Sequence, residues 1–157
     1  MIIGISAAFA CILASSMAGV WYRKLSLFSL SIVKKHEIEK QVYFVNETRE
    51  IIKYYQASKI VVAPSFSEGF SLVTAEAMAC ECSVIATKNV GVHSEIITHH
   101  KNGYLFEAGN SAELETLLSQ KIRGELPFLG QEARAEILKN WSAAKEAAQL
   151  VNVYTST

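Results

Sequence analysis

The chain has 157 residues, and its fifteen basic residues balance fifteen acidic residues, which leaves no net charge. Every acidic residue is a glutamate, so the sequence excludes an Asp-x-Asp metal site, an aspartate that orients a catalytic histidine, and an EF-hand loop. Half of the residues are hydrophobic and 19% are charged, which indicates one globular domain, and the zero net charge argues against a nucleic-acid-binding protein.

Residues 1–35 form an apolar N-terminal segment. The run at 2–20 has no charge and is nearly long enough to cross a bilayer, and the two aromatic and two basic residues at 21–24 resemble an interfacial anchor. This flank would place the rest of the chain on the cytoplasmic face of a membrane. The many Ala, Ser and Gly residues of the run favour instead a buried strand and helix, with residues 1–5 as the strand.

The remainder predicts alternating helices and strands. Short apolar strands that alternate with amphipathic helices are typical of an α/β fold, in which a Rossmann-like parallel sheet has helices on both faces. Such a sheet binds ligands beyond the carboxyl ends of its strands. The first predicted elements are a helix ending near residue 35, a strand at 42–45 and a helix from the N-cap Asn46. A strand at 60–63, a helix at 71–80, and strands at 84–86 and 104–106 follow. The chain then forms a helix capped by Asn110 and Glu113 and a last helix over 133–148.

The segment after the strand at 60–63 has the residues for a binding site. Its turn supplies Glu68 and Gly69 just before a helix N-terminus, where free N–H groups favour a phosphate. A carboxylate there suits hydroxyl groups of a sugar, and Glu76, eight residues later, suits the two hydroxyls of a ribose. The pattern therefore favours a nucleotide sugar. The alternative is that Glu68 caps the helix and Glu76 is solvated.

Residues 61–79, which contain Pro-Ser-x-x-Glu-Gly-Phe and the Glu-x7-Glu pair, closely resemble the signature of glycosyltransferase family four. These are retaining, metal-independent enzymes with the two-domain GT-B architecture. The resemblance covers roughly residues 36–150, in which 42–44 looks like the strand before the signature and Trp141-Ser142 fits the last helix. It implies that residues 36–157 are the C-terminal, donor-binding half of a GT-B enzyme.

By this resemblance, Glu68 is the catalytic carboxylate, in contact with hydroxyls of the donor sugar. Glu76 binds the ribose of a UDP- or GDP-linked donor, and no metal or other cofactor is needed. The remaining donor-binding residues, whose backbone lines the sugar and the diphosphate, are Gly69, Phe70, Ser71 and Leu72.

Several positions depart from the family pattern. Glu81 and Ser83 replace a usual glycine and proline after the signature helix, and Glu81 would adopt a positive φ less readily than glycine. Val92 replaces the second glycine of a pair, and His100 stands where a turn glycine is common.

The other polar candidates are weaker. We expect the histidines at 93, 99 and 100 to lie on surface loops, with a minor binding role for the first of them. Cys80 and Cys82 are expected to be core or helix-end thiols rather than metal ligands, and the pair Tyr54-Tyr55 to pack rather than to stack on a base. An odd number of cysteines, three, favours a reducing, cytoplasmic location.

The chain shows no counterpart of the family's N-terminal acceptor domain or of its basic Gly-Arg…Lys-Gly segment. Three functions fit this pattern: the donor half of a glycosyltransferase that acts with a separate acceptor-domain subunit, a non-catalytic module that binds nucleotide sugars or a partner protein, or a truncated remnant. Transfer requires both substrates to be aligned, so we expect no transfer by this chain alone.

Overall fold

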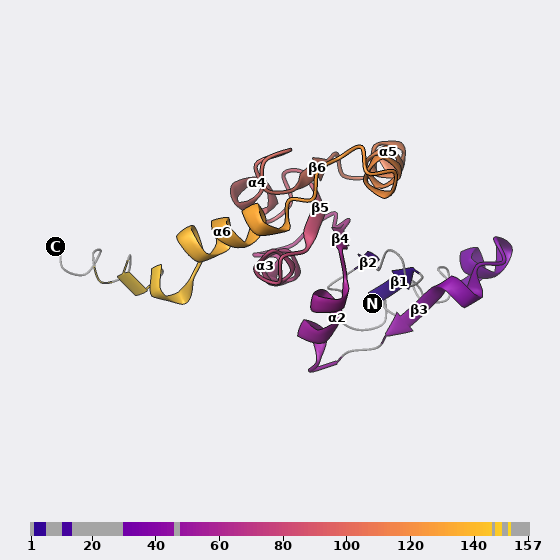
Figure 1. Ribbon diagram of the computed structural model, residues 1–157, viewed down its shortest axis with the longest axis horizontal. Coiled ribbons are helices and arrows are strands. Elements are labelled where there is room, and N and C mark those ends of the chain that lie inside the picture. The colour runs from indigo at the N-terminus through magenta and orange to yellow at the C-terminus, as the bar shows by residue number, and fades with distance from the viewer. Residues whose placement is uncertain are drawn as a thin grey trace.

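The centre of the molecule is a four-stranded parallel sheet with the strand order β2-β4-β5-β6 (Figure 1). Its strands are β2 (Cys11–Leu13), β4 (Ile60–Ala63), β5 (Ser83–Thr87) and β6 (Tyr104–Phe106). The computed structural model describes residues 2–5, 11–13, 30–45, 48–145, 147–148 and 151. The predicted strands at 60–63, 84–86 and 104–106 are therefore confirmed.

Every residue of β4 and β5 is buried, as expected for strands covered on both faces. Successive side chains point to opposite faces, so Val61 and Val84 contribute to one hydrophobic cluster and Val62 and Ile85 to another. These two clusters form the core on either side of the sheet. The α/β prediction with both faces covered is confirmed.

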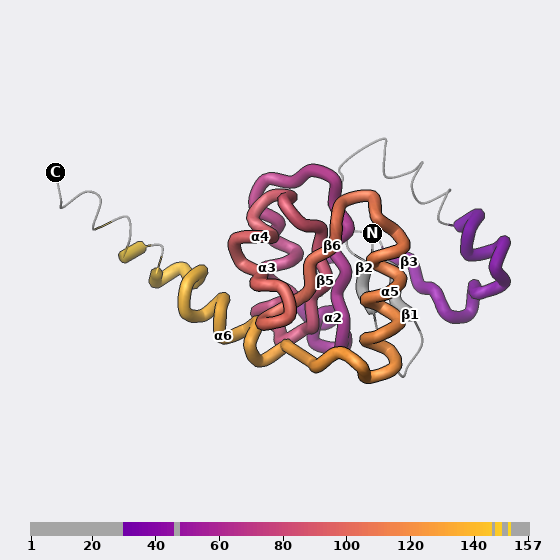
Figure 2. Tube along the Cα trace, turned by 90° about the horizontal axis from the view of Figure 1, so that it is seen from above, coloured from indigo at the N-terminus to yellow at the C-terminus, as the bar shows by residue number. Residues whose placement is uncertain are grey.

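Helices cover the two faces unequally. α5 (Ser111–Ile122) lies on one face, and α2 (Ile51–Ala57), α3 (Leu72–Ala79) and α6 (Gly130–Asn140) lie on the other, as Figures 1 and 2 show. The short α4 (His93–Ile96) follows β5. The side chains that anchor these helices in the two clusters are Tyr55 from α2, Met78 from α3, Ile96 from α4, Ile137 from α6 and, on the opposite face, Leu117 from α5.

A second, two-stranded sheet pairs β1 (Ile2–Ile5) with β3 (Val42–Val45) in antiparallel register, with Ile2 opposite Val45. The predicted strands at 1–5 and 42–45 are confirmed in position, but the expectation that 42–45 joins the parallel sheet is wrong. Unlike β4, β3 is only partly buried, and Tyr43 is 63% exposed. A short 3₁₀ helix, η1 (Glu39–Gln41), leads into β3.

The apolar run at 2–20 contains β1 and β2, so its described parts are strands and not turns of one helix. Residues 6–10 and 14–20 lie outside the described residues, as do 21–29. Residues 30–35 are helical, which confirms the end of the first predicted helix. Within the described ranges, no helix combines the length and the apolar character needed to cross a membrane.

Two predicted helix boundaries are wrong. α2 begins at Ile51 rather than after Asn46, which lies outside the described residues, and the Glu50 N–H donates to Thr48 Oγ1 at 3.1 Å instead. The last helix is interrupted, because α6 ends at Asn140 and the chain bends at 141–142. The predicted cap of α5 is confirmed, since the Glu113 N–H donates to Asn110 Oδ1 at 3.1 Å.

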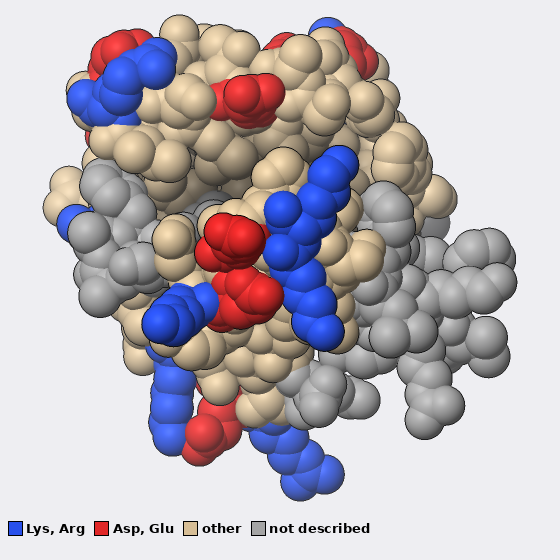
Figure 3. Space-filling model, turned by 90° about the vertical axis from the view of Figure 1, so that its right-hand side faces the viewer, with Lys and Arg blue, Asp and Glu red and all other residues tan. Residues whose placement is uncertain are grey.

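The surface charge is mixed. Figure 3 shows acidic and basic side chains side by side over one face of the molecule, without an area of a single sign. The ion pairs found among the described residues are exposed, such as Lys88 with Glu107 at 3.0 Å and Arg123 with Glu125 at 2.6 Å. Exposed pairs of this kind contribute little to stability.

Candidate functional site

The loop of residues 64–71 connects the carboxyl end of β4 to the start of α3, where parallel sheets bind ligands. Within it, the Ser65 hydroxyl donates to the carboxylate of Glu68, which is half-buried. Among the described residues, the Ser65 hydroxyl donates to Glu68, whereas no N–H group of α3 does. Glu68 therefore does not cap the helix. Its remaining acceptor positions are available to hydroxyl groups of a ligand.

Ser71 enters α3 in a left-handed conformation, with φ 53° and ψ 66°. A serine at the N-cap usually accepts a hydrogen bond from a helix N–H, but the Ser71 side chain does not. Its hydroxyl instead lies 3.0 Å from Thr74 Oγ1 and 2.8 Å from His93 Nε2. Since no cap from Ser71 occupies the first N–H groups of α3, they can bind an anion.

The loop after β5 packs directly on the loop after β4. Gly91 has φ +52°, and a Cβ built on it would lie 2.5 Å from the carbonyl oxygen of Gly69 and 3.5 Å from Glu68 Cβ. Thr87 Oγ1 also donates to the Ser65 carbonyl at 2.7 Å. These contacts fix Glu68 and Gly69 from a second segment, which the motif at 61–79 alone did not predict.

Glu76 lies in the second turn of α3 and is half-buried. The Tyr55 hydroxyl donates to Glu76 Oε2 at 3.3 Å. Burial, together with the charge of Glu76, raises the pKa of Tyr55, so its phenol remains a donor. Glu76 is thus held toward α2 rather than simply solvated, and a carboxylate with about four acceptor positions still has room for ribose hydroxyls. Tyr55 is fully buried, which confirms its packing role, whereas Tyr54 is exposed.

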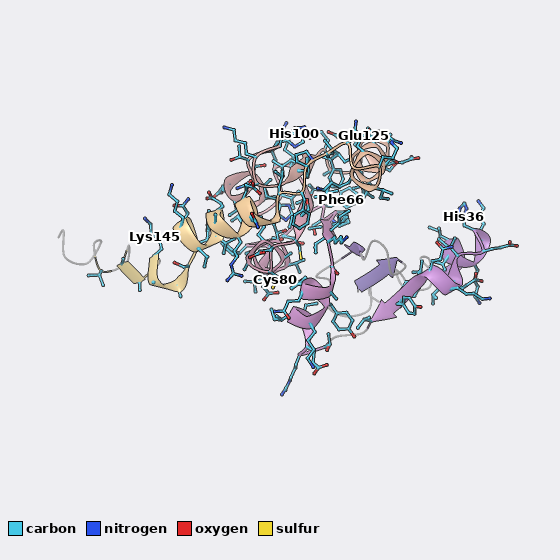
Figure 4. All side chains as sticks on the ribbon, in the orientation of Figure 1. His36, Phe66, Cys80, His100, Glu125 and Lys145 are labelled. Carbon is cyan, nitrogen blue, oxygen red and sulfur yellow. The ribbon has the colours of Figure 1, made fainter. Side chains whose placement is uncertain are left out.

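Exposed apolar side chains surround this loop. Phe66 is 78% exposed, Leu72 is 65% exposed and Phe70 is 43% exposed. Figure 4 shows Phe66 projecting from the end of β4, where its ring lies close to the turn at Gly109. The Phe70 ring lies 5.8 Å from that of Trp141. The side chain of Phe70 therefore packs toward the C-terminal segment, which leaves its backbone at the site.

The prediction that His93 lies on a surface loop is wrong, because its side chain is fully buried. His99 and His100 are exposed, as predicted. The expected positive φ of Glu81 is confirmed at 61°, and His100, at the turn-glycine position, has φ 63°. These two residues adopt the backbone conformation that glycine usually supplies.

Cys80 and Cys82 lie in the turn between α3 and β5 and are free thiols, one at the helix end and one in the core, as predicted. Cys82 is fully buried, with its Sγ 3.2 Å from the Tyr55 carbonyl oxygen. Burial raises the pKa of Cys82 to about 12, which keeps it protonated and unreactive. Cys80 is half-buried at the end of α3.

The family model for glycosyl transferases group 1 matches residues 26–150. The chain belongs to this family. Among curated relatives, the N-acetyl-alpha-D-glucosaminyl L-malate synthase of Bacillus anthracis is 30% identical over 127 residues, which cover 80% of this chain and 33% of that protein. The putative glycosyltransferase EpsD of Bacillus subtilis is 32% identical over 128 residues, with the same two coverages. The chain spans about a third of the length of these relatives.

Solved structures give the same fold. The C-terminal domain of the glycosyl transferase group 1 family protein LpcC from Francisella tularensis has a TM-score of 0.70 and 32% identity, over 80% of this chain and 67% of that one. Anabaena HepE in complex with UDP has a TM-score of 0.82 and 22% identity, over 95% of this chain and 41% of that one. The fold is thus the Rossmann-like domain of GT-B glycosyltransferases, as predicted.

Proposed function

We propose that this group 1 glycosyltransferase domain binds the nucleotide-sugar donor of a retaining, metal-independent transferase of family four. In this proposal the donor-binding domain occupies residues 36–157, in keeping with the family match over 26–150. Glu68 is the catalytic carboxylate at the donor sugar. The diphosphate and the sugar lie against the backbone of Gly69, Phe70, Ser71 and Leu72.

The observation that carries the proposal is the open N-terminus of α3 beside a fixed glutamate. The left-handed Ser71 leaves the helix without a side-chain cap, while Ser65 and the Gly91 loop hold Glu68 next to it. Helix N–H groups and the helix dipole favour the diphosphate, and the carboxylate accepts hydrogen bonds from sugar hydroxyls. Anion and sugar recognition thus lie side by side without a need for a metal.

Glu76 takes the ribose in this proposal. Its position in the second turn of α3, and its hydrogen bond from Tyr55, keep the carboxylate at one orientation over the same end of the sheet. Because the carboxylate is already ordered before binding, the ligand loses less binding free energy to the ordering of this side chain.

The donor class is UDP- or GDP-linked. The relative HepE was solved with UDP and with UDP-glucose, which supports a uridine nucleotide as the first ligand to test. In this proposal the donor domain works together with an acceptor domain, and the chain spans about a third of the length of these relatives. We also propose a cytoplasmic location, in keeping with the free thiols of Cys80 and Cys82.

The test is calorimetric titration of the full chain with UDP-glucose and with GDP-mannose, followed by the same titrations of Glu76→Gln. Loss of a charged acceptor should weaken binding about tenfold or more, because hydrogen bonds to a carboxylate contribute roughly 1.5–3 kcal/mol. Glu115→Gln is the matched control, since Glu115 is exposed on α5.

Binding of neither nucleotide sugar would overturn the donor-domain proposal. Equal affinity in Glu76→Gln and Glu115→Gln would leave the domain assignment intact but would remove Glu76 from the ribose site. Retention of anomeric configuration is then read by proton NMR of the product once an acceptor domain of a relative is added.

A further inference from the structure

His93 is a buried polar side chain that the donor-site motif does not account for. It begins α4, in the loop after β5, and is fully buried. Its Nδ1 lies 2.8 Å from the Thr87 carbonyl oxygen, and its Nε2 lies 2.8 Å from Ser71 Oγ. Both nitrogens are therefore engaged, one with the sheet and one with the entry to α3.

The chemistry of the two partners assigns the tautomer. A carbonyl oxygen can only accept, so Nδ1 carries the proton and donates to Thr87. In the neutral ring Nε2 is then an acceptor, and the Ser71 hydroxyl donates to it. Ser71 Oγ also lies 3.0 Å from Thr74 Oγ1, within hydrogen-bond distance.

Ser71 needs such support. A non-glycine residue in the left-handed region is destabilised by the approach of its Cβ to the following carbonyl. Ser71 has φ 53° and is only 7% exposed, so its hydroxyl contacts hold an unfavourable backbone conformation in place. That conformation sets the direction in which the first N–H groups of α3 point.

The same network reaches the other end of the loop. The Thr87 carbonyl oxygen accepts the hydrogen bond from His93, and the Thr87 hydroxyl donates to the Ser65 carbonyl at 2.7 Å. Ser65 in turn donates to Glu68. His93 thus connects, through Thr87 and Ser71, both ends of the loop at 64–71.

We propose that His93 is a positioning residue of the donor site, which holds Ser71 in the left-handed conformation so that the N-terminus of α3 faces the diphosphate. This role rests on the proposed function. His93 does not touch the ligand, because its ring is buried beneath the loop.

The decisive comparison is His93→Leu alone and together with Ser71→Gly, each in the full chain. His93→Leu should weaken binding of UDP, or of GDP if that nucleotide binds more tightly, by about fivefold to thirtyfold. Glycine adopts positive φ without strain, so adding Ser71→Gly should recover most of that loss. Leu117→Ala, a buried change in the opposite cluster, controls for loss of core packing alone.

Hydrogen exchange of the peptide covering residues 68–78 gives a readout that needs no nucleotide. Exchange at the start of α3 should be faster in His93→Leu, should slow again in the double variant, and should be unchanged in Leu117→Ala. In the wild type, nitrogen-15 NMR should find the proton of His93 on Nδ1 even if the variants fold poorly.

Unchanged affinity and exchange in His93→Leu would overturn the proposal, as would a loss that Ser71→Gly does not recover or a proton on Nε2 instead of Nδ1. If the wild type binds neither UDP nor GDP, the proposed function fails. Exchange and NMR then decide by themselves whether His93 holds the conformation of Ser71.

Discussion

The two ends of the parallel sheet use the same rare backbone conformation differently. At the carboxyl ends of β4 and β5, Ser71 and Gly91 have positive φ and lie in loops that contact each other. At the amino ends, Glu81, His100 and Gly124 have positive φ where the chain turns after a helix. At the first edge, side-chain contacts hold the strained backbone of Ser71 and shape the candidate site, whereas at the second edge the positive φ lets the chain reverse direction after a helix.

The amino edge of the sheet also has a cavity, but the presence of a cavity does not identify the edge that binds a ligand. A cavity of about 470 Å³ opens at the amino end of β4, between Ile60 and the turn after α5. Its buried cation, Lys121, already donates to the Pro127 carbonyl and lies 5.3 Å from the centre of the Tyr104 ring. The fold therefore already satisfies the buried ammonium group of Lys121, while the N-terminus of α3 remains open at the other edge.

The largest expected effect comes from adding one methyl group at the carboxyl edge, at Gly91. In Gly91→Ala the new Cβ would meet the Gly69 carbonyl at 2.5 Å, and backbone cannot move away as a side chain can. We expect a more than tenfold loss of UDP affinity and a fall of about 2 kcal/mol in the free energy of unfolding, read by titration and by urea denaturation.

Gly124→Ala is the matched change at the amino edge. Gly124 has φ +73° and nothing within 4 Å of a new Cβ, so only the backbone strain of about 1 kcal/mol applies. UDP affinity should not change. A loss of affinity as large as that of Gly91→Ala would show that the two edges are not functionally distinct.

A smaller effect is expected at Ser83, the first residue of β5. Its hydroxyl is buried and finds no hydrogen-bond partner among the described residues. Ser83→Ala should therefore raise the free energy of unfolding by about 1 kcal/mol, measured by urea denaturation, without a change in UDP affinity. A less stable variant would mean that the hydroxyl has a partner after all.

The smallest effect is expected for Glu81→Gly. Glycine removes the left-handed strain after α3, but the exposed ion pair of Glu81 with Arg134, at 3.7 Å, is lost as well. We expect a gain of about 0.5 kcal/mol, seen as a slightly higher Tm. Glu81→Ala keeps the strain and loses the same ion pair, so it should show no gain. An equal Tm for both variants would argue that strain at this position is negligible.

Local sequence signals predicted three of the four strands of the parallel sheet, β4, β5 and β6, and the loop that carries the candidate site. The strand at 60–63 is a continuous apolar run stopped by Pro64, and the strand at 104–106 follows the Asn-Gly turn. Asn110 and Glu113 identified the start of α5 because a cap is a short-range contact. The Glu-x7-Glu motif correctly indicated that Glu68 lies in the loop before α3 and that Glu76 lies within this helix.

Features that depend on distant parts of the chain could not be predicted. β3 pairs with β1, about forty residues earlier, and no local pattern selects that antiparallel partner. The burial of His93 has no signal in a loop sequence, because it results from contacts with Thr87 and Ser71. The same holds for the bond between Tyr55 and Glu76, which joins two helices.

The most direct test of the site is amide NMR of the full chain during titration with UDP. If the open N-terminus of α3 binds the diphosphate, the largest shift changes will occur at the amides of residues 69–73 and of Gly91, with little change near Gly124. Changes concentrated around Gly124 and Lys121, or none at the start of α3, would contradict the assignment of the donor site to the carboxyl edge of the sheet.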